Sequence, residues 1–151
     1  MRTFEIALSS DHGEDLQLMD EVITDLYPHQ IKIRFSSPLD LLLHETISWF
    51  EVRKPPVAII AGYRAAFQDL KIIADLKKRP AYQWVPVFLL VDEDLTYIRN
   101  RFLSFGVTDV VTWPHTVADL DDQLAMWLNS VQRNLLAERR RERRTAEPDS
   151  W

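Results

Sequence analysis

Short apolar runs alternate five times with longer amphipathic stretches along the chain. The runs are typical of strands, whereas in the stretches apolar residues recur every three or four positions, as on one face of a helix. Parallel strands need a crossover between them, so this alternation favours a parallel sheet with helices on both faces. The pattern therefore predicts a doubly wound, five-stranded parallel α/β fold, and the flavodoxin-like strand order is its simplest form.

The predicted strands differ in how apolar they are. Residues 31–35 alternate strictly between apolar and polar side chains, which is typical of a half-buried or edge strand. Residues 57–61 are apolar throughout, as expected of a central parallel strand. The five predicted strands are residues 4–8, 31–35, 57–61, 85–91 and 107–112.

Serine, proline and glycine mark the predicted helix boundaries. Ser37-Pro38 favours a helix start, with serine at the N-cap and proline at the first position. Gly106 is expected to end a helix, because glycine readily adopts the left-handed conformation found there. The predicted helices are residues 16–26, 38–54, 67–79, 95–105 and 116–144.

Composition excludes several classes of protein. The chain is 46% hydrophobic and 27% charged, as in folded globular proteins. Its three glycines form no glycine-rich phosphate loop, and the absence of cysteine excludes disulfides, zinc–thiolate sites and thiol nucleophiles. No apolar run reaches the length of about 18 residues that a membrane helix needs. We therefore expect a cytoplasmic protein, and an enzyme or small-molecule domain is disfavoured.

The charge is unevenly distributed. Residues 133–151 hold six arginines and four acidic residues, so this segment carries +2 and residues 1–132 carry −7 of the total of −5. An acidic body is a poor nucleic-acid binder on electrostatic grounds. We therefore divide the chain into a domain over residues 1–132 and a basic extension over residues 133–151, and nucleic acid could bind only through the extension.

Three segments resemble the receiver domain of two-component response regulators. Residues 76–90, with LKKRP and VPVFLL, look like the family's L-R-x…I-P-V-I-x-L-T. Residues 106–114, GVTDVVTWP, look like its G-A-D-D-Y-I-x-K-P, and residues 55–60 fall where it has P-D-L-I-L-L-D. The resemblance covers about residues 3–130. It implies a CheY-like (βα)5 fold and a role in signal transduction.

The residues that carry phosphorylation in that family are replaced. Phosphoryl transfer depends on positioned charge and a metal ion, and neutral hydroxyls do not substitute for two carboxylates around Mg²⁺. The chain is thus similar to pseudo-receivers, which keep the fold and lack the chemistry, and we expect no phosphorylation, cofactor or catalysis. The degenerate positions are Ser9 and Ser10 for the acidic pair, Ala61 or Gly62 for the acceptor aspartate, Val91 for the hydroxyl, Trp113 for the lysine and Val110 for the aromatic switch.

Acidic residues at the same sheet edge have two interpretations. They could form a residual metal site, or they could cap helix N-termini and interact with the helix dipole. We favour the second interpretation. The residues are Asp11, Glu14, Asp15, Asp92, Glu93 and Asp94.

The Trp113-Pro114 pair carries a further expectation. The resemblance implies a cis peptide bond, because the corresponding Lys–Pro bond of receivers is commonly cis. Trp113 itself could contact a partner, plug the former phosphate pocket or fill the core, and the sequence leaves these alternatives open.

The last predicted helix carries an apolar seam. Val117, Leu120, Leu124, Trp127 and Val131 are spaced three, four, three and four residues apart, as in a coiled coil. The seam is either the sheet-facing stripe of this helix or a surface for another chain. The resemblance implies a two-fold dimer through the fourth helix, fifth strand and fifth helix. The expected interaction residues are Ile98, Phe102, Val110, Trp113, Trp127, Leu128, Val131 and Leu135.

The end of that helix alternates in charge. Residues 138–144 interleave glutamate with arginine, which is typical of a solvated helix or a coiled-coil flank. Binding of nucleic acid through these arginines is the alternative. The segment could also lead into an effector domain.

Overall fold

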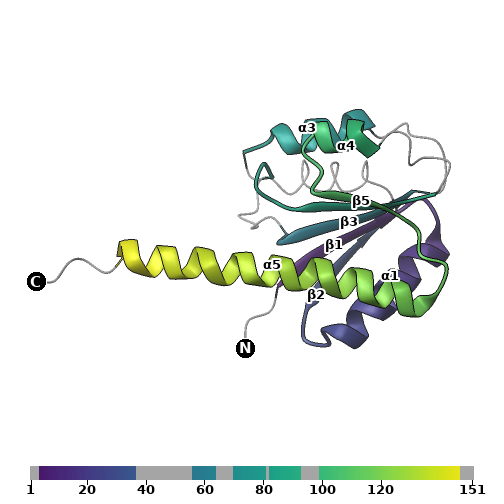
Figure 1. Ribbon diagram of the computed structural model, residues 1–151, viewed down its shortest axis with the longest axis horizontal. Coiled ribbons are helices and arrows are strands. Elements are labelled where there is room, and N and C mark those ends of the chain that lie inside the picture. The colour runs from purple at the N-terminus through teal and green to yellow at the C-terminus, as the bar shows by residue number, and fades with distance from the viewer. Residues whose placement is uncertain (1–3, 37–55, 64–69, 81, 93–98, 147–151) are drawn as a thin grey trace, which may run out of the picture.

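The computed structural model describes residues 4–36, 56–63, 70–80, 82–92 and 99–146. In these residues each strand except β2 is followed by a helix, as Figure 1 shows. The predicted helix over residues 38–54 lies outside the described residues. The elements are β1 (Glu5–Ser10), α1 (Gly13–Leu26), β2 (Ile31–Phe35), β3 (Ala58–Tyr63), α3 (Leu70–Lys78), β4 (Val87–Val91), α4 (Arg99–Ser104), β5 (Asp109–Thr112) and α5 (Val117–Ala146).

The five strands form one parallel sheet in the order β2-β1-β3-β4-β5. This is the flavodoxin-like order, so the predicted fold class is confirmed. Strands β3 and β4 are buried along their whole length, whereas no residue of the edge strand β2 is fully buried, as expected of a half-buried edge strand. The strand order reverses between β1 and β3, which places a topological switch point at their carboxyl ends.

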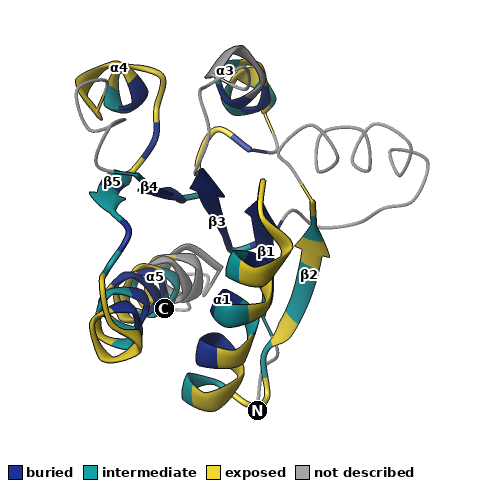
Figure 2. Ribbon diagram, turned by 90° about the vertical axis from the view of Figure 1, so that its right-hand side faces the viewer, coloured by how far each residue is buried: buried dark blue, intermediate teal, exposed yellow. Residues whose placement is uncertain are grey.

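Helices cover both faces of the sheet. Helices α1 and α5 lie on one face and α3 and α4 on the other, as Figure 2 shows. Successive strand residues point to opposite faces, so Leu8 and Ile60 pack under α1 and α5 while their neighbours Ala7 and Ile59 pack under α3 and α4. The chain therefore has two cores, one on each side of a single sheet.

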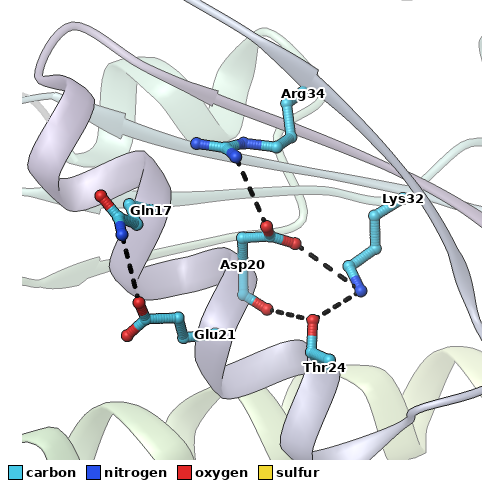
Figure 3. A network of polar contacts seen from close by, with 6 residues as sticks. All are labelled: Gln17, Asp20, Glu21, Thr24, Lys32 and Arg34. Carbon is cyan, nitrogen blue, oxygen red and sulfur yellow. Dashed lines mark hydrogen bonds and ion pairs between the residues drawn. The ribbon is translucent and has the colours of Figure 1, made fainter.

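Polar contacts join the edge strand to α1 (Figure 3). The carboxylate of Asp20 lies 3.6 Å from Lys32 Nζ and 3.6 Å from Arg34 Nη1. Lys32 Nζ also donates a hydrogen bond to Thr24 Oγ1 at 2.6 Å. These contacts are partly exposed, and such ion pairs contribute about 0–1 kcal/mol each. They position β2 against α1.

The predicted end of the fourth helix and start of the last helix are confirmed, whereas several strand boundaries are corrected. Gly106 has a φ of 96°, and the Oγ1 of Thr116 accepts a hydrogen bond from the Asp119 N–H at 3.1 Å. Strands β1 and β3 each end two residues later than predicted, at Ser10 and Tyr63. Strand β4 begins at Val87 rather than at residue 85, because Pro86 has no N–H to donate to the sheet. Strand β5 begins at Asp109 rather than at residue 107. Helix α5 continues without a break across the division predicted at residues 132 and 133.

Candidate functional site

The carboxyl edge of the sheet is the candidate site, because open α/β sheets bind ligands at this edge, beside the switch point. Ser10 pairs in register with Gly62, and both lie at strand ends. Trp113 follows β5 directly, and its backbone N–H donates to the Val91 carbonyl at 2.9 Å. The structure thus brings the predicted degenerate positions to one edge.

The two faces of the sheet divide these positions. Trp113 belongs to the core under α1 and α5, and Gly62 faces it. Ala61 and Val91 belong to the core under α3 and α4, and Ser9 pairs in register with Ala61 and so shares that face. Of the two residues considered for the acceptor position, Gly62 is therefore the one that meets Trp113.

Trp113 fills the space above Gly62. A Cβ atom at position 62 would overlap Cζ2 of Trp113 and lie 3.1 Å from its Cη2. The Trp113 side chain is only 5% exposed. The interpretation of Trp113 as a surface contact for a partner is therefore wrong, because the ring is packed into the chain's own core.

The Trp113–Pro114 peptide bond is trans. The expectation of a cis bond is therefore wrong. It depended on the resemblance alone, and the trans form of a bond before proline is the more stable by about 0.5–1 kcal/mol unless its surroundings favour cis.

The two serines at the end of β1 do not fit the metal ion that binds at this position in receivers. The Ser10 Oγ accepts a hydrogen bond from the His12 N–H at 3.1 Å, which orders the turn into α1. The Ser9 Oγ is buried on the opposite face and has no hydrogen-bond partner among the described residues. Neither hydroxyl carries charge. In the described ranges, no three His, Asp or Glu side chains come together as a metal site.

The nearby acidic residues lie around the start of α1. Glu14 and Asp15 are in its first turn, where carboxylates interact favourably with the helix dipole. The N-cap residue is His12, and its own side chain makes no capping hydrogen bond. Asp92 is half-buried after β4, and residues 93 and 94 lie outside the described residues.

The expected interaction residues are mostly buried. Trp127 and Leu128 are each 3% exposed, and the Trp127 ring stacks on Phe88 with the ring centroids 4.8 Å apart. The prediction that these two side chains remain free for another chain is therefore wrong, because α5 packs a broad apolar face on the sheet. Phe102, Val110 and Val131 are also buried, Leu135 is half-buried, and Ile98 lies outside the described residues.

Asp109 links α4, β5 and α5, and the sequence analysis did not identify it. Its Oδ2 accepts a hydrogen bond from Trp127 Nε1 at 3.0 Å. Its Oδ1 lies 3.5 Å from Arg99 Nη2, and Arg99 Nε donates to the Val110 carbonyl at 3.1 Å. One half-buried carboxylate therefore fixes the relative positions of three elements. An acid within an otherwise apolar strand was the signal that could have revealed it.

A groove at the opposite edge of the sheet was also not predicted. It lies between α5 and the loops that precede β3 and β4, and its lining includes Pro56, Trp84, Leu135 and Arg141. The Trp84 side chain is 83% exposed. Lys77 holds the loop that carries it, because Lys77 Nζ donates to three carbonyl groups there at 2.6–3.2 Å.

None of the described helices is long and apolar enough to cross a membrane.

The comparisons with known proteins concern the fold. No protein-family model matches the chain, and no curated protein matches it in sequence. Solved structures do match. The phosphorylated cyanobacterial phytochrome response regulator RcpA has a TM-score of 0.68 at 14% identity, over 80% of this chain and 88% of that one.

Two further structures show the same similarity. The chemotaxis response regulator CheY4 of Vibrio cholerae has a TM-score of 0.67 at 12% identity, over 86% of this chain and 99% of that one. The Mn²⁺-bound form of response regulator Rcp1 has a TM-score of 0.66 at 19% identity, over 80% and 88%. The chain therefore has the CheY-like fold of response-regulator receiver domains.

Proposed function

We propose that this chain is a pseudo-receiver: a signalling domain that acts by binding, without phosphorylation, and regulates an effector. The observation that carries the proposal is the indole of Trp113 against the bare α-carbon of Gly62. This contact occupies the position at which the resemblance places the acceptor carboxylate.

The surrounding chemistry supports the proposal. An aspartyl phosphate needs a carboxylate nucleophile, a metal ion and a cation that neutralises the phosphoryl oxygens. Gly62 has no side chain, Ser9 and Ser10 are neutral, and a buried Trp113 replaces the cation. A phosphoryl group at position 62 would thus have neither a point of attachment nor a lysine beside it.

Exposure to a small phosphodonor tests the proposal. The chain would be incubated with acetyl phosphate and Mg²⁺ and analysed by intact-mass spectrometry, with a conventional receiver domain in parallel. We expect the mass spectrum of this chain to show no phosphorylated species, whereas the conventional receiver domain gains the mass of one phosphoryl group. A phosphorylated carboxylate anywhere on this chain, formed at a rate similar to that of the control, would refute phosphorylation independence.

We further propose that binding uses the face formed by α4, β5 and α5. Its support is the network around Asp109, which makes these three elements one unit. Because Phe102, Val110, Trp127 and Leu128 of this face are buried, contact must involve its exposed side chains, among them Arg99, which is half exposed. Dimerisation and docking of a protein partner both fit this arrangement.

Nucleic acid is the alternative partner. Its support is a group of exposed arginines on α5, namely Arg133, Arg140 and Arg141. Neutralising phosphates with arginine makes binding strongly salt-dependent. The test is binding to duplex DNA at low salt. Binding that disappears when these three residues are changed to glutamine would favour this alternative. No binding at low salt would exclude it.

A further inference from the structure

Helix α5 has a second regular stripe, on the side that faces away from the sheet. Its residues recur every three or four positions and all are exposed, whereas Leu124, Trp127 and Val131 on the opposite side are buried. Two of its residues are large and apolar: Met126 is 57% exposed and Leu136 is 54% exposed. The outward stripe consists of Asp119, Asp122, Met126, Asn129, Arg133, Leu136 and Arg140.

Charge is divided along the outward stripe. Its acidic residues, Asp119 and Asp122, lie near the start of α5, and its basic residues, Arg133 and Arg140, lie toward the end. Asp122 and Arg140 form no ion pair within the part of the chain that the structure describes. Two such stripes side by side place like charges together when the helices are parallel and opposite charges together when they are antiparallel.

We propose that the outward stripe binds the same stripe of a second copy of this chain, with the two α5 helices antiparallel. The apolar residues set the register, with Met126 against the partner's Leu136. Asp122 lies one turn before Met126, and Arg140 lies one turn after Leu136. The same register therefore brings Asp122 to the partner's Arg140, and two-fold symmetry repeats both contacts.

The length of α5 supports a helical partner. The helix spans Val117–Ala146 and continues well past the body of the domain, as Figure 1 shows. Short helical segments without tertiary packing are marginally stable in water. A second helix lying along the stripe would supply that packing. This inference rests on the proposed function, since it names a second copy as the binding partner of α5.

Charge reversal tests the arrangement. In an antiparallel pair, D122R sets arginine against the partner's Arg140, and R140D sets aspartate against the partner's Asp122. We expect sedimentation velocity at low salt to show a monomer–dimer equilibrium, with each variant raising the dissociation constant about tenfold or more. The double variant D122R/R140D restores opposite charges and should recover the wild-type dissociation constant.

The matched control is R141D, which makes the same charge change one residue away, at a position that lines the groove rather than the outward stripe. Circular dichroism verifies that each variant is folded. A chain that stays monomeric at high concentration, or a dimer unaffected by D122R and R140D, would overturn the proposal. The phosphodonor experiment does not depend on assembly, so the proposed function and this inference fail separately.

Cysteine cross-linking tests the register, because the chain contains no cysteine. A mixture of M126C and L136C should form a disulfide under mild oxidation, and neither variant should cross-link with itself. In the proposed register two copies of residue 126 lie about 15 Å apart along the helix axes, too far for a disulfide. A disulfide between two copies of M126C, without any disulfide between M126C and L136C in the mixture, would indicate a parallel pair and contradict the proposal.

Discussion

The indole of Trp113 and the bare α-carbon of Gly62 share one small region at the carboxyl edge of the sheet. Each constrains the other, because any side chain at position 62 would overlap the ring. Gly62 also lies in a buried strand, where glycine is otherwise unfavourable because it has no side chain to pack. The packing of Trp113 gives a physical reason for glycine at this position.

We predict that Gly62→Ala lowers the free energy of unfolding by about 1–3 kcal/mol, because the added methyl group overpacks the core against Trp113. Urea denaturation measures the change. Gly13→Ala is the control, since a Cβ atom there would have no neighbour within 4 Å. Equal effects of the two substitutions would contradict the packing argument. In the double variant with Trp113→Leu, the cost of Gly62→Ala should decrease.

A second prediction at this scale concerns Tyr27, whose hydroxyl donates to Asn129 Oδ1 at 2.6 Å and so joins the end of α1 to α5. Partial burial raises the pKa of Tyr27 above its ordinary value of 10.0. The folded chain therefore keeps this proton to higher pH than the unfolded chain, and the resulting stability is present below pH 10 and decreases as the pH rises above it. At neutral pH the free energy of unfolding of the wild type should exceed that of Tyr27→Phe. Urea denaturation at increasing alkaline pH should show this difference becoming smaller. A difference that stays constant with pH would contradict this assignment.

The elements themselves were largely predictable from the sequence. Strands such as residues 57–61 are apolar because both faces of a central parallel strand are covered, and Gly106 ends α4 for the conformational reason given above. The burial of Trp127 and Leu128 was not predictable from spacing. A helix on a sheet buries an apolar face at least 100° wide, so Leu128 beside the seam is buried together with Trp127.

The candidate site was predictable only in part. The alignment of motifs identified Ser10, Trp113 and either Ala61 or Gly62 as degenerate positions, but it could not show that the Trp113 ring lies against Gly62. That contact depends on which face of the sheet each side chain occupies. The bridging role of Asp109 depends likewise on three elements that are distant in sequence.

At the level of elements, we predict that Asp109→Ala destabilises the packing of α4, β5 and α5. The substitution leaves Trp127 Nε1 without its acceptor and removes the carboxylate beside Arg99, at a cost of about 1–3 kcal/mol. Chemical denaturation measures the loss, and near-ultraviolet circular dichroism reports the surroundings of Trp127. Asp75→Ala, at an exposed position on α3, is the control and should change stability little.

On the scale of the whole molecule, α5 combines two functions in one continuous helix. Its first half completes the core beneath the sheet, and its second half extends beyond it (Figure 1). Of the side chains that the structure describes, Leu135 is the last in α5 to pack against that core. The structure therefore separates the part of α5 that the fold needs from the part that is available for binding.

We predict that a chain ending after residue 137 keeps a free energy of unfolding within about 1 kcal/mol of wild type, since it retains every residue of α5 that the structure describes as packed against the core. A chain ending after residue 126 lacks Trp127, Leu128 and Val131 and should not fold. Thermal denaturation followed by circular dichroism distinguishes the two. Loss of folding in the chain that ends after residue 137 would show that the end of α5 is part of the domain.

The contact between Trp113 and Gly62 also bears on how this sequence could change over time. A carboxylate introduced at position 62 alone would overlap the ring, and a lysine introduced at position 113 alone would leave a buried cavity and an uncompensated charge. Either single step lowers stability before it provides any chemistry. A phosphorylatable site built on these two positions would therefore require both substitutions together, and selection acting on single substitutions would disfavour it.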